Sequence, residues 1–247
     1  KGSAGIPTLI EQLQSKDKAY FQIGLLTARQ LSGREVTDAL TAQLPKLASE
    51  RAIGLLSVLA DRNDGGLPPI VLKTAKSGDK ELRIAAINAV GRLGDASSIP
   101  MLLEVAAESD QGIAAAAASA LATVPGDNVN AELVSNLSKA DGKALAALIR
   151  AVGVKRIEAT PELMKSLNNS DPTIRHAALT ALGDTVKQRD LNVLIAQHVK
   201  GKNPSDADVA GQALRAACIR MADREACAAA LAAAMPSAST EANKKLV

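Results

Sequence analysis

Alanine and aliphatic residues recur at intervals of three and four positions along most of the chain, as expected for helices that bury one face. Between residues 79 and 93 one such face comprises Leu82, Ala85, Ala86, Ala89, Val90 and Leu93. A second stripe follows at Ile99, Leu102, Leu103 and Ala106. The pattern predicts an almost entirely helical chain, with helices at 18–32, 50–60, 80–93, 99–108, 111–123, 131–138, 143–153, 161–168, 172–183, 190–199, 207–221 and 227–234.

This pattern itself repeats about every 31 residues, the spacing of Asp79, Asp110 and Asp141. The segment 6–17 overlies 99–110 three periods later and shares its Ile-Pro pair and final Asp. Further copies of this half are 68–79, 130–141 and 159–171, and copies of the other half are 49–61, 79–91, 141–153 and 171–183. Each period predicts a helical hairpin, and one hairpin covers its apolar faces only by stacking on its neighbours.

The repeat therefore predicts an all-α, right-handed solenoid of about seven to eight hairpins that runs through 1–247 as a single array. The first helix in the pattern is 5–16, the last complete one is 227–234, and the final "STEANKKLV" is similar to the opening of another unit. Because both ends stop in the middle of the pattern, we expect the chain to be a fragment of a longer protein.

Helix ends carry recognisable signals within the repeat. Asp79 and Asp171 precede helices as N-cap acceptors, and Pro172 occupies the first helical position after Asp171. Gly91 and Gly94 stand near a predicted helix end, which predicts a left-handed C-cap there.

The composition indicates how the helices pack and which kinds of partner are not expected. Hydrophobic residues make up 47% of the chain, yet there is one Tyr, one Phe and no Trp, so helices are expected to pack through small side chains. The 29 basic and 26 acidic residues balance too closely to indicate nucleic-acid binding, and base stacking would have few aromatic rings to use. No apolar run approaches the roughly 18 residues of a membrane span.

The segments "ELRIAAINAVGRLGDASSIPMLLEVA" and "TIRHAALTALGD" resemble the short HEAT-like repeats of bacterial proteins. That pattern has a capping Asp, an aliphatic-Arg pair, small residues, Leu-Gly and an Ile-Pro-x-Leu second helix. Arg83 and Arg175 match its arginine, whereas other units hold Phe21, Ala114 or Leu145 at this position. The order of 39–64 and 82–106 also looks like arrays in large exported bacterial proteins, which implies a bacterial extracytoplasmic location.

No enzymatic motif accompanies the repeat. His176 and His198 are followed by Ala177 and Val199, not by the glutamate of the His-Glu pairs that HEAT-type hydroxylases use to bind iron. The chain has no phosphate loop, nucleophile elbow or zinc spacing. We therefore expect no catalytic, cofactor-binding or metal-binding residues. Two alternatives stay open, namely an accessory segment of a carbohydrate-active or redox enzyme whose catalytic domain lies elsewhere, and a HEAT-type lyase.

Charge is distributed unevenly along the array. The range 93–138 has six acidic and no basic residues, and 139–224 has 14 basic and 9 acidic residues. In HEAT arrays the second helices line the concave face. This resemblance implies a non-catalytic scaffold that binds a protein partner or a neighbouring domain of the same parent chain. The candidate binding face comprises Glu104, Glu108, Asn136, Lys139, Lys165, Asn169, Gln197 and Lys200; the alternative is ordinary solvation of exposed helices.

Two local predictions complete this picture. Cys218 and Cys227 lie equidistant from a predicted turn, so a disulfide between antiparallel helices is geometrically reasonable, and two small buried thiols are the alternative. The unit 111–141 contains "AAAAASALA", whose side chains bury less apolar surface than leucine does. We expect local opening to be easiest in that unit.

Overall fold

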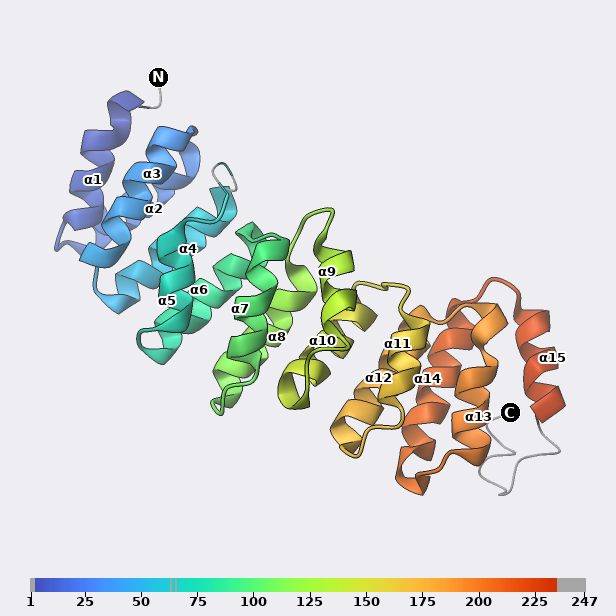
Figure 1. Cartoon of the computed structure of the whole chain (residues 1–247). Helices are drawn as coiled ribbons and strands as arrows, with labels where there is room; N and C mark the ends of the chain where they lie inside the picture. Colours follow the sequence, from blue (N-terminus) through green and yellow to red (C-terminus); the bar gives the residue numbers. More distant parts are fainter. Residues whose placement is uncertain (1–2, 63, 65, 235–247) are drawn as a thin grey trace. The chain divides into compact units, whose positions relative to one another are not determined.

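The computed structural model describes residues 3–62, 64 and 66–234, and within them it contains fifteen α-helices and no β-strand (Figure 1). The helices are α1 (Ile6–Gln14), α2 (Lys18–Gln30), α3 (Arg34–Gln43), α4 (Ser49–Arg62), α5 (Pro69–Lys76), α6 (Lys80–Leu93), α7 (Ile99–Ala106), α8 (Gln111–Thr123), α9 (Val129–Asn136), α10 (Gly142–Val154), α11 (Thr160–Ser166), α12 (Pro172–Thr185), α13 (Asn192–Lys200), α14 (Ala207–Arg220) and α15 (Arg224–Ala234). The predicted all-α fold is confirmed.

The predicted helices are all present, and α6 and α8 have the predicted ends. The predicted helix ranges omitted α1, α3 and α5; the repeat copies 6–17 and 68–79 cover α1 and α5, whereas α3 was missed altogether. Two of the four buried residues of α3 are polar, Thr37 and Gln43, which weakens the apolar stripe. Arg62 Nε donates to Thr37 Oγ1 at 2.9 Å, and Gln14 Nε2 donates to Gln43 Oε1 at 2.8 Å, so both polar groups are satisfied.

The chain divides into two compact units, Lys1–Val129 and Asn130–Val247. In the first unit the first helices of the repeats, α2, α4, α6 and α8, pack in sequence, and in the second unit α10, α12 and α14 do so. The remaining helices are the second helices of the repeats. Continuity of the array across the unit boundary and its right-handed winding stay predictions, and the C-terminal "STEANKKLV" segment lies outside the described residues.

First helices approach one another closely through glycine and alanine. A Cβ added to Gly91 would lie 2.9 Å from Ala120 Cα, and one added to Gly183 would lie 2.9 Å from Ala213 Cα. The predicted left-handed cap at Gly91 and Gly94 is therefore wrong. Gly91 is buried inside α6 against α8, and Gly94 has φ −72°. Glycine at 91 is required by packing distance and not by backbone conformation.

The capping aspartates act as the sequence predicts. Asp79 accepts from the backbone N of Leu82 at 3.0 Å, and Asp171 accepts from Thr173 N at 2.8 Å. The same motif also joins successive repeats, because Lys80 Nζ lies 3.0 Å from Asp110 Oδ2. Asp79, Asp110 and Asp171 thus satisfy orphan helix N–H groups, and Asp110 also binds the repeat before it. Asp141 precedes α10 without such a side-chain bond.

Among the described helices, none combines the length and apolar character that crossing a membrane requires.

Candidate functional site

The motif arginine ties three elements of the array together. Arg83 on α6 donates from Nε to the carbonyl of Ala75 near the end of α5, at 3.0 Å. Its two terminal nitrogens bind Glu108, which follows α7, at 3.0 and 2.6 Å. This bidentate pairing raises the pKa of Arg83 above its ordinary value. We use the term arginine socket for the arginine's surroundings, namely a carbonyl at the end of the preceding second helix and a polar group that follows the next second helix.

Arg175 on α12 fills its socket in the same manner. One terminal nitrogen donates to the carbonyls of Asn169 and Ser170, at 3.0 and 2.9 Å. Nε and the other nitrogen bind the Asp206 carboxylate at 2.6 and 3.1 Å, with both side chains buried. His176 Nε2 lies 2.9 Å from the same carboxylate. Hydrogen bonds from Arg175 and then His176 lower the pKa of Asp206 below its ordinary value, although burial opposes this.

In the first repeat, an arginine from the next first helix takes the place of the motif arginine. Phe21 stands at the motif position, and the guanidinium of Arg51 on the next first helix lies 4.6 Å from its ring centroid. Arg51 also donates to the carbonyls of Ser15 and Lys16 at the end of α1, the latter at 3.1 Å. The carbonyls at the end of the second helix therefore again accept from an arginine.

The repeat that carries Leu145 has a pocket at this place. Leu145 stands two periods after Arg83, Leu137 stands two periods after Ala75, and Asn169 aligns with Glu108. All three line a pocket of about 280 Å³, together with Ser138, Glu162, Lys165 and Ser166. The pocket thus corresponds to an arginine socket in which leucine replaces the arginine.

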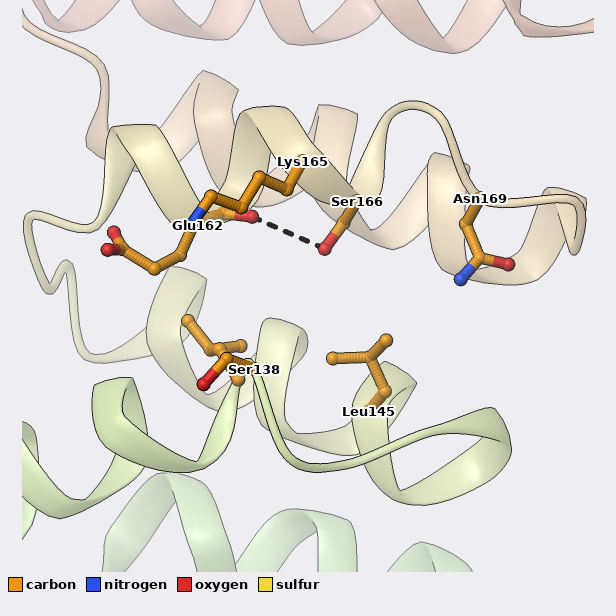
Figure 2. A pocket seen from close by; sticks show the side chains of 7 residues that line it. Ser138, Leu145, Glu162, Lys165, Ser166 and Asn169 are labelled. Atoms are coloured by element: carbon orange, nitrogen blue, oxygen red, sulfur yellow. Dashed lines mark hydrogen bonds between the residues drawn. The ribbon is translucent and has the colours of Figure 1, made fainter.

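The polar rim of this pocket combines the donors of Lys165 and Asn169 with the carboxylate of Glu162. Figure 2 shows Lys165, Ser166 and Asn169 along one side, opposite Ser138 and Leu145. The Asn169 Oδ1 atom accepts from the backbone N of Asp171 at 2.9 Å, so its amide nitrogen is the group directed toward the pocket (Figure 2). Ser166 Oγ donates to the Glu162 carbonyl at 3.4 Å. With the Lys165 ammonium, the rim is suited to carbonyl or carboxylate oxygens.

A second pocket, of about 380 Å³, opens on the other side of α11. Its apolar lining comes from Met164 and Leu167 of the α11 segment and from Val193 and Ala196 of α13. Its polar lining residues are Asn168, Asn192 and Gln197, all amides. Successive second helices of this unit therefore flank two pockets, each with an apolar part and an amide-bearing rim.

The predicted face is divided between the two units and differs in chemistry between them. In the first unit Glu104 Oε2 lies 2.6 Å from Lys76 Nζ, and Glu108 binds Arg83, so both carboxylates serve internal ion pairs. In the second unit Asn136 Nδ2 donates to the Glu132 side chain at 2.7 Å.

The remaining predicted residues lie near or in the pockets of the second unit. Lys165 and Asn169 share the Leu145 pocket, Gln197 lines the α13 pocket, and Lys139 and Lys200 are exposed. Sequence reasoning missed Leu137, Ser138, Glu162 and Ser166 as lining residues. The signal that could have found the site was Leu145 at the motif arginine position.

The histidines lie away from both pockets. His176 is bound to Asp206, and His198 is buried, with Nδ1 3.0 Å from the carbonyl of Ala207. In the described part of the chain, no group of three or more His, Cys, Asp or Glu side chains is arranged to hold a metal ion.

The two cysteines are free thiols in this structure. Both line one further pocket, of about 370 Å³, between α14 and α15. Burial, and secondly the neighbouring Cys227 thiol, raise the pKa of Cys218 to about 11. Their disulfide stays a prediction, and the structure places the thiols as direct neighbours.

No curated protein sequence matches the chain. Among solved structures, human deoxyhypusine hydroxylase in complex with glycerol is 15% identical, with 87% of this chain and 96% of that chain covered and a TM-score of 0.43. YibA of Escherichia coli is 16% identical, with 89% and 83% covered and a TM-score of 0.44. A designed armadillo repeat protein in complex with the peptide (KR)4 is 16% identical, with 86% and 99% covered and a TM-score of 0.39.

A family model describes most of the sequence. Residues 34–122 and 130–215 match the model of HEAT repeats, and together they make up more than half of the chain. The chain therefore belongs to the HEAT repeat family.

Proposed function

We propose that this chain is a non-catalytic binding module whose second-helix surface in residues 130–234 holds an extended, acidic segment of a protein partner. The observation that carries the proposal is the pair of pockets on either side of α11, each with an apolar part and an amide-bearing rim. The segment can come from a separate protein or from a neighbouring domain of the same parent chain.

The chemistry of the pockets indicates what kind of segment they suit. An extended main chain supplies carbonyl oxygens that have no intrachain partner, and these match the amide nitrogen of Asn169. Its side chains project at regular intervals, so apolar ones can enter the hydrophobic parts of two pockets that lie on successive repeats. The exposed ammonium groups of Lys139, Lys165 and Lys200 favour carboxylate side chains on the segment.

The polar clusters of this unit support a binding role without catalysis. The His176–Asp206–Arg175 cluster lies outside both pockets, and its buried carboxylate is engaged by two neighbouring side chains of α12. Such a network stabilises the junction between repeats. A catalytic group would instead have to lie within hydrogen-bond reach of a bound substrate.

A peptide-selection experiment tests the proposal. Phage-displayed peptides are selected on the purified chain, and the enriched sequences are measured by fluorescence anisotropy with the wild type and with Leu145→Arg and Lys165→Glu. We expect acidic peptides to be enriched. Lys165→Glu should weaken them by about tenfold, which corresponds to about 1.4 kcal/mol.

Leu145→Arg restores the motif arginine and fills the pocket with a side chain of this protein. It should therefore reduce peptide binding while the thermal stability of the chain is retained. The matched control is Arg215→Glu, which makes the same charge change at an exposed position of the first helix α14. Absence of acidic peptides from the selection, or equal losses in Lys165→Glu and Arg215→Glu, would contradict the proposal.

A further inference from the structure

The helices α14 and α15 bring three sulfur atoms to one place. Cys227 is 3% exposed, and its Sγ lies 3.4 Å from Met221 Sδ. Cys218 is partly exposed and lines the same pocket of about 370 Å³, together with Ile219, Arg224 and Leu231. The nine-residue separation in the sequence is spanned by the turn between α14 and α15, which returns Cys227 to the side of Cys218.

We propose that Cys218 and Cys227 form a reversible intrachain disulfide that fixes α15 on α14. The pocket gives a small oxidant access to the thiol of Cys218, whereas the Cys227 thiol is shielded from solvent. Cys218 therefore reacts first, and Cys227 resolves the intermediate. This inference is independent of the two pockets proposed to hold a peptide, because neither is lined by residues of α14 or α15.

The reaction is a thiol–disulfide exchange with a low-molecular-weight disulfide such as oxidised glutathione. The Cys218 thiolate attacks one sulfur of that molecule, which forms a mixed disulfide and releases one glutathione thiolate. The Cys227 thiolate then attacks the sulfur of Cys218, which closes the intrachain bond and releases the second glutathione. Two electrons pass to the oxidant, and the protons of both cysteines leave with the released thiols.

The protonation state of Cys218 sets the rate of the first step. Burial and the adjacent Cys227 raise its pKa to about 11, and Arg224 is the other ionisable group that lines this pocket. The thiolate is the attacking species, so the first step should accelerate as the pH rises from 7 toward that value.

The bond has a structural consequence for the last described hairpin. Closing a loop as short as 218–227 removes conformations from the opened state and opposes undocking of α15. Amide exchange in α15 should therefore become at least about tenfold slower on oxidation. The pocket lined by Ile219, a residue that is 79% exposed, would be held in one form.

The test uses the 247-residue chain incubated with excess oxidised glutathione and then alkylated. We expect loss of both free thiols, an intact mass lower by two hydrogen atoms, and tryptic peptides 216–220 and 225–244 joined by a bond that reductant cleaves. Hydrogen exchange of α15 is compared before and after oxidation.

The Cys218→Ser variant is the main control, because the remaining Cys227 thiol cannot form an intrachain disulfide. The Cys227→Ser variant is a second control, provided that circular dichroism shows that this variant is folded. Glutathione adducts without joined peptides in the wild type would overturn the proposal, as would disulfides between two chains. A bond that forms without slower exchange would overturn the claim that it fixes α15.

Discussion

At the scale of single residues, the contact between Arg175 and Asp206 shows how one side chain links a repeat to the next. Arg175 belongs to α12, and Asp206 immediately precedes α14. Both side chains are buried, so each charge depends on the other for compensation. A buried ion pair contributes modestly when intact, but removing one partner is costly because it leaves an uncompensated charge.

Asp206→Asn should therefore lower the free energy of unfolding by about 3 kcal/mol at pH 7. The folded pKa of Asp206 lies below its ordinary value of 3.8, so the carboxylate stabilises the protein fully above that value. This contribution is lost as the pH falls through the folded pKa. Urea unfolding of both proteins at neutral and acid pH measures the difference, and an undiminished difference at the acid end would contradict the assignment.

Gly91→Ala should destabilise the protein by about 1–3 kcal/mol, because the new Cβ would meet the backbone of α8 and overpack the contact. Gly112→Ala is the matched control. Its Cβ would lie 3.0 Å from the flexible end of Lys80, and alanine favours the helix by up to about 1 kcal/mol, so we expect no loss of stability. Thermal unfolding of the two variants checks the sign, and equal destabilisation would argue against the close-packing explanation.

At the scale of helices, the repeat 111–141 combines several features that favour local opening. The helix α8 buries only Ile113, Ala117, Ala120 and Leu121, two of which are alanine. The following turn contains Gly126 with φ +116°, and the boundary between the two compact units falls after Val129. The repeat 111–141 buries little apolar surface in α8 and contains the boundary between the compact units. Both features lower the free-energy cost of opening this repeat locally.

Hydrogen exchange should consequently be faster in 111–141 than in 79–108 and 171–200. The expected cause is the smaller apolar area buried per residue in the alanine-rich helix. Mass spectrometry of peptides from the three ranges provides the measurement. Equal protection in all three would show that alanine packing stabilises this unit as well as leucine does elsewhere.

The helices could largely be predicted because apolar spacing and capping residues act locally. Asp79 and Asp171 predicted helix starts that the structure confirms. The helix α3 was not predicted because one of its buried positions is the polar Thr37. This residue can be buried because Arg62 of another helix hydrogen-bonds to it, which apolar spacing does not reveal. The prediction of a helix cap at Gly91 was wrong for a related reason. This glycine is needed for the close contact with Ala120, which belongs to the next repeat.

The candidate site shows the same limit. Lys165 and Asn169 were placed on a binding face by register, and the structure brings them into one pocket. Glu108 was assigned to that face as well, but it pairs with Arg83. Alignment identifies which positions correspond, whereas the identity of each partner depends on side chains in neighbouring repeats.

At the scale of the whole chain, the two compact units should unfold as separate cooperative steps. Contacts in a repeat array are local, so a substitution acts mainly on the unit that contains it. We expect two thermal transitions by calorimetry. Gly91→Ala should shift one of them and Asp206→Asn the other, and a single transition that responds to both variants would contradict this expectation.

The arginine socket implies a trade-off that operates separately in each repeat. A repeat that keeps its arginine uses the socket to strengthen its own junctions, as Arg83 and Arg175 do. A repeat with leucine there gives up those bonds and gains free volume, as at Leu145. Under the proposed binding function, the number and order of such exchanges determine where an array of constant length carries pockets, and single substitutions would add or remove them.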